Sequence, residues 1–168
     1  MMMKKKVRTI HNPLIKFEYD KKQIGKSTGV RIYRNATLLA PGTWADSITN
    51  SPVVYPREIL RKYAANWEER YLNIDHSTRV LDRIGTVENP HFEDGRVKAD
   101  LYIYPVTQNA KDVINLIDKG LVNWLSVEIK TEDIWDVSKN LRRVNWMSFI
   151  GCAVVLYPAC EEAIINES

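Results

Sequence analysis

The most constraining feature of this sequence is a succession of short β-like runs between residues 80 and 105, separated by turn residues. The runs "VLDRIGTVEN" and "RVKADLYIYP" are typical of strands, and "EDG" at 93–95 lies between them. Two β-like runs joined by a short turn that contains glycine indicate a β-hairpin. The centre of the chain therefore predicts antiparallel strands.

Two other segments show helical rather than strand spacing. The segment 56–71 begins with a proline suited to the first turn of a helix, and the segment 107–120 ends with Gly120, a typical helix stop. Their apolar residues recur every three or four positions: Ile59, Leu60, Tyr63, Ala64 and Trp67 in the first, and Ala110, Val113, Ile114 and Ile117 in the second. Two amphipathic helices are therefore predicted.

Further strand-like segments lie at 14–19, 30–40, 121–131 and about 142–157. Many strands with two helices between them predict an α+β fold with a mainly antiparallel, barrel-like core. At 168 residues the chain is long enough for one domain with a sizeable core. We expect this domain to span 28–168, after a polar, Lys-rich and mobile N-terminal segment over 1–27.

Charge and composition argue against several classes of protein. The net charge is only +3 and, apart from "KKK" at 4–6, Lys and Arg are dispersed, which does not favour nucleic-acid binding. No apolar run approaches the length of a membrane span, and no apolar segment follows the basic start as in a signal peptide. Cys152 and Cys160 would lie about 26 Å apart in a strand, too far for a disulfide, and unbridged thiols fit the reducing cytoplasm.

His76, in "DHS", and Ser126, in "WLSVEI", are the residues best placed to carry chemistry. A lone histidine of this kind is more often a surface or packing residue, and a serine in a strand is often only a tolerated polar residue. A serine hydroxyl becomes a useful nucleophile when an imidazole lies within hydrogen-bonding distance to accept its proton. The functional hypothesis therefore requires that His76 and Ser126 meet in the folded chain.

Alternation along the predicted strand places Ser126 and Glu128 on one face. We expect the apolar face of Leu125, Val127 and Ile129 to pack into the core, which turns Ser126 and Glu128 toward solvent or a cleft. The chain has no GxSxG, GxxxxGK[ST] or GxGxxG motif, and its three scattered histidines and two cysteines do not form a zinc pattern. No metal and no cofactor are expected.

The order of these pieces resembles the prohead (capsid maturation) serine proteases of tailed phages and related archaeal viruses. The resemblance spans residues 30 to 163 and follows "DHS", "IGTVEN", "EDG", "ADLYIY", a helix ending in glycine, "LSVEI" and "YPAC". The separation of 50 residues between His76 and Ser126 is part of it. The family is similar in fold to the herpesvirus assemblin, so the resemblance implies an assemblin-like barrel of about seven strands flanked by helices.

The resemblance implies a serine endopeptidase that cleaves scaffold and major capsid proteins during maturation of the viral head. The expected location is the host cytoplasm, inside the assembling procapsid. The histidine base of the family falls on His76 and its serine nucleophile on Ser126. His76 would deprotonate Ser126 and later protonate the leaving amine. The resemblance also allows a homodimer, and neither a membrane nor a nucleic acid is expected as a partner.

One feature departs from the family pattern. The third residue of the family, acidic or histidine, usually lies in the strand after the serine, but 137–160 contains no Asp, Glu or His. Either Ser126 and His76 act as a dyad, or another residue orients the base. The candidates are Glu128, Asp75, Asp82, Asn145 and Ser148. The alternative hypothesis is a catalytically inactive capsid or scaffold-binding component with the same fold.

Three further features near the predicted strands have competing interpretations. Trp124 shares a face with Ser126 and is a candidate for lining a substrate cleft. The pair Arg142 and Arg143 in "LRRV" fits either backbone donation to an oxyanion and binding of acidic scaffold, or the solvated face of a strand edge. The acidic residues of 132–136 are expected at a solvated strand end.

Overall fold

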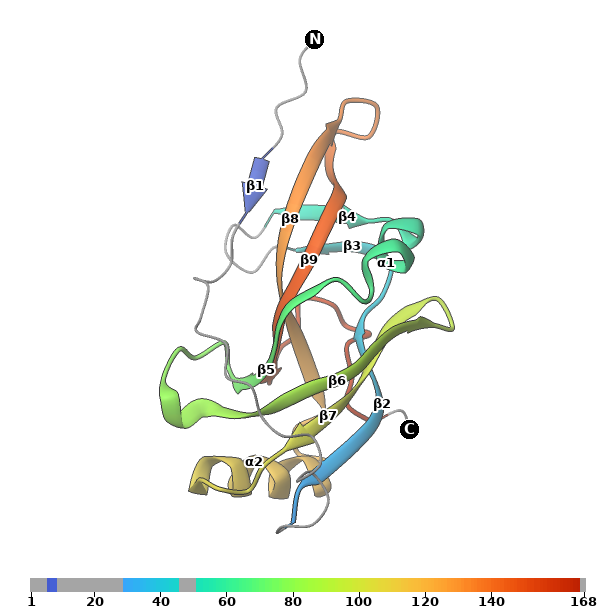
Figure 1. Ribbon diagram of the computed structural model, residues 1–168. Coiled ribbons are helices and arrows are strands. Elements are labelled where there is room, and N and C mark those ends of the chain that lie inside the picture. The colour runs from blue at the N-terminus through green and yellow to red at the C-terminus, as the bar shows by residue number, and fades with distance from the viewer. Residues whose placement is uncertain (1–5, 9–28, 46–50, 167–168) are drawn as a thin grey trace.

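The structure, a computed structural model, describes residues 6–8, 29–45 and 51–166 (Figure 1). Nine strands and two α-helices are found in these residues, with a short 3-10 helix, η2 (Val80–Asp82), between them. The strands are β1 (Lys6–Arg8), β2 (Arg31–Leu39), β3 (Gly42–Ala45), β4 (Pro52–Tyr55), β5 (Trp67–Ile74), β6 (Arg83–Glu93), β7 (Arg96–Ile103), β8 (Trp124–Asp136) and β9 (Leu141–Val155). The helices are α1 (Arg57–Tyr63) and α2 (Gln108–Asp118).

The strands form one curled sheet in the order β1-β8-β9-β5-β6-β7-β2, with the β3–β4 hairpin attached to β9 through β4. All pairs are antiparallel except β4–β9 and β5–β9. The long β8–β9 hairpin crosses the β6–β7 hairpin, and α2 lies at the base of the sheet (Figure 1). The predicted α+β class, with a mainly antiparallel, barrel-like core flanked by helices, is confirmed as a half-barrel.

Irregularities in two strands accompany the curl of the sheet. The pairing of β2 with β7 shifts register around Asn35, and the pairing of β6 with β7 shifts around Asn89. Both asparagines have positive φ angles, 55° and 50°, a conformation that asparagine adopts more readily than most residues. β-Bulges of this kind bend a strand and increase its twist. They let β2 and β6 wrap around β7.

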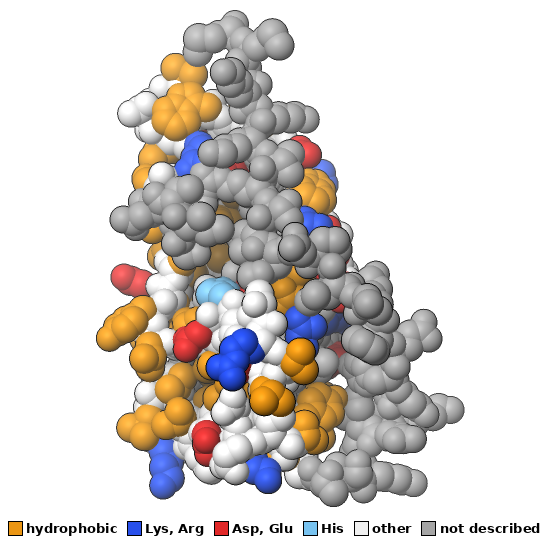
Figure 2. Space-filling model, turned by 90° about the vertical axis from the view of Figure 1, so that its left-hand side faces the viewer, with side chains coloured by type: hydrophobic (Ala, Val, Ile, Leu, Met, Phe, Trp, Pro, Cys, Tyr) orange, Lys and Arg blue, Asp and Glu red, His pale blue; other side chains and the backbone are white. Residues whose placement is uncertain are grey.

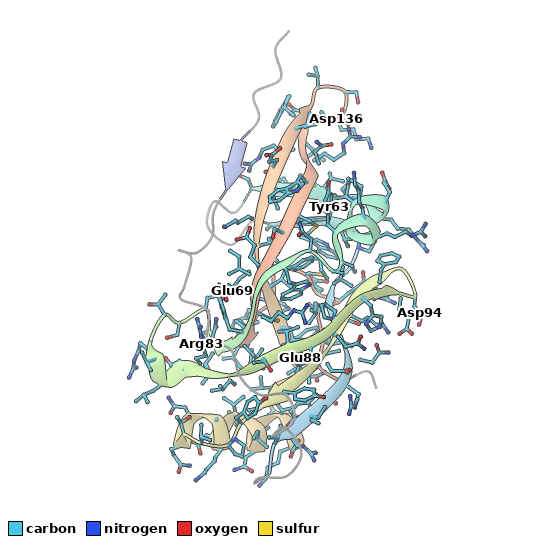
Figure 3. The ribbon with its side chains drawn as sticks, in the orientation of Figure 1. Tyr63, Glu69, Arg83, Glu88, Asp94 and Asp136 are labelled. Carbon is cyan, nitrogen blue, oxygen red and sulfur yellow. The ribbon has the colours of Figure 1, made fainter. Side chains whose placement is uncertain are left out.

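The hairpin predicted from "EDG" is confirmed as β6–β7. Glu93 pairs with Arg96, so Asp94 and Gly95 form a two-residue loop, and both have positive φ angles. Such a loop matches the right-handed twist of the flanking strands. Asp94 marks the tip of this hairpin and Asp136 lies near the tip of the β8–β9 hairpin, and the two hairpins point in different directions (Figure 3).

The second predicted helix is also confirmed, as α2. The hydroxyl of Thr107 accepts a hydrogen bond from the backbone N–H of Ala110, which caps the first turn. Ala110, Val113 and Ile117 are buried against the sheet. Gly120, with a φ angle of 71°, ends the helix in the left-handed conformation expected of a C-terminal glycine.

The first predicted helix is too long. Only Arg57–Tyr63 is helical, whereas Trp67–Ile74 is the strand β5. Apolar spacing alone does not separate the two states here, because Trp67 fits the helical pattern and also a strand. In the structure Trp67 pairs with Phe149 of β9, and their rings stack with centroids 4.6 Å apart. This long-range pairing with β9 is the reason that the segment is a strand rather than a helix.

The β8–β9 hairpin is longer than expected, because β8 continues to Asp136 and β9 begins at Leu141. Asp133, expected at a solvated strand end, is instead buried in β8 and pairs with Val144. Alternation along β8 places Asp133 on the same face as Leu125 and Ile129, where the β3–β4 hairpin lies against it. The solvated ends of this hairpin are therefore confined to its tip.

The core fills the concave side of the half-barrel. Its largest fully buried side chains include Phe149, Leu38, Leu72, Leu101 and Leu125, which come from five different strands. Cys152 and Cys160 are both free and buried, as expected from their spacing. Burial raises the pKa of both thiols.

Among the described side chains visible in Figure 2, basic and acidic ones are scattered among uncharged and hydrophobic ones. No helix in the described part of the chain is long and apolar enough to cross a membrane. Apart from β1, the predicted N-terminal segment 1–27 and the strand predicted at 14–19 lie outside the described residues. The division into this segment and a single domain over 28–168 stays a prediction.

Candidate active site

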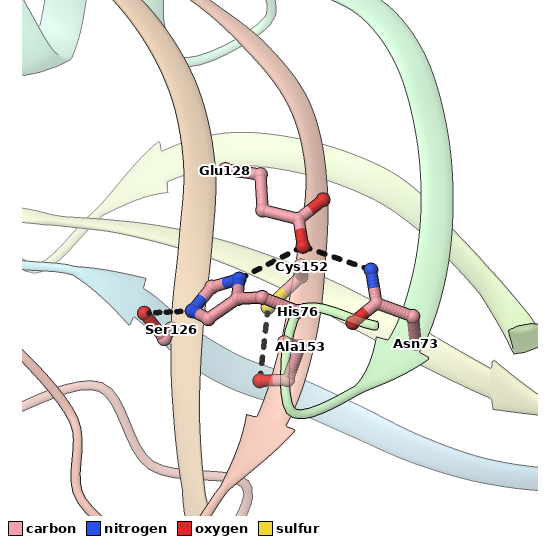
Figure 4. Close-up of polar contacts among 6 residues, drawn as sticks. All are labelled: Asn73, His76, Ser126, Glu128, Cys152 and Ala153. Atoms are coloured by element: carbon pink, nitrogen blue, oxygen red, sulfur yellow. Dashed lines mark hydrogen bonds and ion pairs between the residues drawn. The ribbon is translucent and has the colours of Figure 1, made fainter. Parts of the chain in front are cut away.

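Ser126 and His76 lie in contact although 50 residues separate them in the chain. Ser126 Oγ is 2.9 Å from His76 Nε2, a hydrogen-bonding distance (Figure 4). Both side chains are partly exposed, so the pair is open to a ligand. The sequence hypothesis required the two side chains to meet, and the structure brings them together.

Strand register explains the meeting. Ser126 of β8 pairs with Ala153 of β9, and Ile74 at the end of β5 pairs with Val154, the next residue of β9. The chain after β5 therefore emerges at the level of Ser126, on the other side of β9. The following turn carries His76 back over β9 to the serine (Figure 4).

A tight turn in an uncommon backbone conformation holds His76. Asp75 and His76 have φ angles of 52° and 57°, and the N–H of Ser77 donates to the carbonyl of Ile74 at 2.9 Å. Two consecutive left-handed residues closed by this bond form a type I′ turn. Left-handed non-glycine residues each cost on the order of 1 kcal/mol, although Asp and His tolerate the conformation better than most. Such strain is often found at functional sites.

Glu128 contacts the other nitrogen of the imidazole. Its Oε1 lies 2.8 Å from His76 Nδ1, so one hydrogen-bonded chain runs from Ser126 Oγ through the ring to Glu128 (Figure 4). Alternation along β8 puts Ser126 and Glu128 on the same face, as expected. The expectation that Glu128 points toward solvent or a cleft is wrong. It is fully buried, because β5 and the turn after it cover this part of the face.

Two residues of β5 also lie near the carboxylate of Glu128. Asn73, which is buried, donates from Nδ2 to Oε1 at 2.8 Å, the same oxygen that faces His76. Tyr71 lies near Glu128, and burial, with a smaller contribution from this carboxylate, raises the pKa of Tyr71. The guanidinium of Arg83 lies over the Tyr71 ring, 4.0 Å from its centroid. Buried carboxylates need such donors, since an unpaired buried charge is costly.

The other candidates for a third residue lie elsewhere. Asp75 is exposed in the turn. Asp82 accepts hydrogen bonds from Ser77 and from Asn109 of α2, and no contact joins it to His76. The hydroxyl of Ser148, in β9, is directed at the carbonyl of Asn66 at 3.4 Å.

Asn145, the last candidate, is exposed in β9, where Val144 beside it pairs with Asp133, far from Ser126 along β8. Glu128 is therefore the candidate that contacts the imidazole. The absence of an acid in 137–160, which favoured an inactive protein, loses its force, because β8 itself supplies a carboxylate at the second nitrogen.

The proposed oxyanion role of the arginine pair is wrong. Arg142 and Arg143 pair with Trp135 and Ile134, whereas Ser126 pairs with Ala153. Ile134 lies eight positions after Ser126 in β8, which is about 26 Å in a strand. Arg142 and Arg143 also pair with β4, so they belong to the distal end of the hairpin.

This arrangement is suited to proton transfer from a serine hydroxyl. An imidazole that accepts at Nε2 must carry its proton on Nδ1, and a carboxylate at Nδ1 selects that tautomer. Among the described residues, no group of three or more His, Cys, Asp or Glu side chains is placed to hold a metal ion. Sequence reasoning missed Asn73 and Tyr71, because nothing in a strand sequence indicates which residue of a distant strand it will face.

Comparison with solved structures finds a likeness in fold. No protein-family model and no curated protein matches the sequence. The fold is similar to the capsid assembly protease of bacteriophage T4, with a TM-score of 0.47 and 12% sequence identity over 77% of this chain and 98% of that chain. At this TM-score and identity the likeness does not assign a function.

Proposed function

We propose that the chain is a serine endopeptidase in which Ser126 is the nucleophile, His76 the general base and Glu128 the residue that orients His76. The observation that carries the proposal is the hydrogen-bonded chain from Ser126 Oγ through both imidazole nitrogens to a fully buried carboxylate. Serine, histidine and acid in this order define the catalytic triad on several unrelated folds. A histidine with only a structural role would not be expected to place its second nitrogen against a partly exposed serine.

The proposed reaction follows from these contacts. Ser126 Oγ attacks the carbonyl carbon of the scissile peptide bond while His76 Nε2 takes its proton. Glu128 stabilises the imidazolium that forms, and the imidazolium then gives the proton to the leaving amine. A water molecule then attacks the acyl-enzyme while His76 takes its proton. The imidazolium returns this proton to Ser126 Oγ as the new carboxyl group is released.

We further propose that this protease acts in the maturation of a viral head. This assignment is supported by the order of the sequence motifs that resemble the prohead proteases, which also implies the relation to the assemblin fold. On this proposal the substrates are scaffold and major capsid proteins, cut inside the procapsid in the host cytoplasm. A homodimer is part of the same proposal, and light scattering on the purified protein tests it.

An active-site label tests the enzyme proposal without a known substrate. A fluorophosphonate probe should attach to Ser126 in the wild type and not in Ser126→Ala, and mass spectrometry locates the attached group. Ser126→Ala should also lose cleavage of an unfolded protein such as β-casein while its circular dichroism stays unchanged. Ser138→Ala, in the exposed β8–β9 turn, is the matched control. Equal labelling of Ser126→Ala and wild type would remove Ser126 from the mechanism.

A further inference from the structure

Among the described residues, partners of the β8 edge that faces away from β9 are found at its two ends. At one end Ile164 pairs with Trp124, and at the other β1 pairs with Thr131–Asp133. Within the part of the chain that the structure describes, no segment pairs with Ser126–Lys130 on this side. We call Ser126–Lys130 the open edge.

The open edge presents backbone hydrogen-bonding groups beside the nucleophile. Every second residue of an antiparallel strand directs its N–H and C=O to the same edge. The N–H of Leu125 donates across this edge to the carbonyl of Ala163 at 2.9 Å. The N–H and C=O groups of Val127 and Ile129 therefore point the same way, next to Ser126. A strand edge with such groups is a template for another extended chain.

The two flanking segments also define a direction and a length. β1 and the segment around Ile164 both run antiparallel to β8. A peptide bound between them in the same direction would have its N-terminal end beside Lys130 and its C-terminal end beside Ser126. The open edge is about 17 Å long, enough for about five extended residues. Beyond Ser126 the edge of β8 is already paired with Ile164. The part of the bound peptide that follows the attacked carbonyl therefore has to leave the sheet.

A mainly apolar pocket opens beside this edge on the inner face of β8. Leu125, Val127 and Ile129 of β8 line it together with Ser126, and Ala159 lies exposed at its rim. The opposite wall is formed by residues of β2 and of the β3–β4 hairpin, among them Leu38, Leu39, Trp44 and Tyr55. Because side chains alternate along a strand, every second side chain of an added strand points into this pocket.

We propose that the open edge binds the polypeptide to be cut as an added β-strand, antiparallel to β8, with an apolar side chain in the pocket. The residues before the scissile bond lie along Val127–Lys130, and the residues after it leave the sheet at Ile164. This inference rests on the proposed protease function and adds to it the substrate class, an extended segment with an apolar residue shortly before the cut. Strand addition combines backbone bonds for affinity with side-chain pockets for selectivity.

Backbone amide exchange followed by nuclear magnetic resonance tests the binding mode without requiring cleavage. Ser126→Ala is mixed with a pool of peptides from a digested proteome, and exchange is compared with that of the protein alone. We expect the amides of Val127 and Ile129 to slow at least tenfold, while amides at the β8–β9 tip are unchanged. Unchanged exchange at both amides would overturn the proposal. So would protection already present without peptide, which would mean that another segment or a second copy covers the edge.

The same peptide pool tests selectivity with the wild type. Mass spectrometry of the products should show apolar residues enriched at one position among the four before the cut and no enrichment after it. Enrichment after the cut, or at no position, contradicts the proposal. If the pool is not cut but the amides of Ser126→Ala are protected, the protease function fails and the strand-binding site stands. If cuts depend on Ser126 and neither signature appears, the reverse holds.

Filling the pocket gives a matched pair of variants. Ala159→Trp places a large ring at the exposed rim, whereas Ala65→Trp places the same ring at an exposed position after α1. We expect Ala159→Trp to lower kcat/KM at least tenfold and to remove the apolar preference, because a hydrophobic pocket discriminates by this order when its volume changes. Ala65→Trp should cleave like the wild type. Equal behaviour of the two variants would show that the pocket does not receive the substrate.

Discussion

The neighbouring residues His76 and Ser77 belong to two different hydrogen-bonded clusters. Each cluster contains a serine, but only the first includes an imidazole. In the first, Ser126 contacts His76, which contacts Glu128, and Asn73 donates to that carboxylate. In the second, Ser77, the residue after His76, donates directly to a carboxylate. Each cluster thus combines a serine, an acid and an asparagine.

The second cluster is built around Asp82. Ser77 Oγ donates to Asp82 Oδ2 at 2.6 Å, and Asn109 of α2 donates to Oδ1 at 2.9 Å. The bond from Ser77 is the main cause that lowers the pKa of Asp82, with smaller contributions from Asn109 and Arg79. This cluster connects η2 to α2.

The difference lies in what accepts the proton of each hydroxyl. A carboxylate whose pKa is lowered is a very weak base near neutral pH, so the Ser77 hydroxyl stays a hydrogen-bond donor. An imidazole can take a full proton in this pH range, particularly when a buried carboxylate stabilises the imidazolium. A serine near an acid is therefore a structural contact, and an intervening histidine is what makes it a candidate nucleophile.

Exchanging the two neighbouring residues of the turn should give the largest contrast. His76→Ala removes the proposed base and should lower kcat about 10⁴-fold or more, with the fold retained. Ser77→Ala should cleave within about threefold of the wild type and lose on the order of 1 kcal/mol of unfolding free energy. Peptide-cleavage kinetics and urea denaturation measure the two effects. Comparable losses of activity in both variants would mean that the turn matters only as a structure.

Neutralising each acid should sharpen the comparison. Glu128→Gln keeps the shape of the side chain but no longer selects the Nδ1–H tautomer of His76, and kcat should fall about 10³- to 10⁴-fold. Asp82→Asn should leave kcat within a few fold, because Asp82 does not contact the imidazole. Pre-steady-state acylation with an activated ester provides the rate. A Glu128→Gln enzyme at full rate would leave a Ser–His dyad as the mechanism.

The two asparagines should separate support of the site from support of the fold. Asn73→Ala removes a buried donor to Glu128 and should lower kcat about 10- to 100-fold with KM unchanged, since a hydrogen bond to a charged group contributes about 1.5–3 kcal/mol. Asn109→Ala should lower the urea midpoint and leave kcat unchanged. A drop in kcat for Asn109→Ala that matches Asn73→Ala would remove the distinction between the clusters.

The smallest expected effect is a pH dependence of stability that belongs to the second cluster. The pKa of Asp82 is lower in the folded chain than in the unfolded one, so this carboxylate stabilises the fold above its unfolded pKa of about 4. This contribution is lost as the pH falls through the folded pKa. The unfolding free energies of the wild type and Asp82→Asn should therefore converge below about pH 4. A difference that is constant from pH 2 to 7 would contradict the assignment.

Local sequence rules accounted for several parts of the molecule. Alternation placed Ser126 and Glu128 on one face, the "EDG" turn located the β6–β7 hairpin, and Thr107 and Gly120 frame α2 in the structure. Each of these depends on residues at most a few positions apart, which is why the sequence is sufficient. The same rules were wrong for Trp67–Tyr71, whose spacing fits both a helix and a strand.

Only the tertiary structure decided the site. The alignment of β5 and β8 against the same residues of β9, Val154 and Ala153, brings His76 to Ser126 across 50 residues of chain. Glu128 was expected at the surface, but β5 covers it, so that it is a buried partner of the imidazole. Local periodicity states which face a side chain takes, whereas the partner it meets there depends on which distant strands pair and in which register. That choice is made by the packing of the whole half-barrel, and no short stretch of sequence contains it.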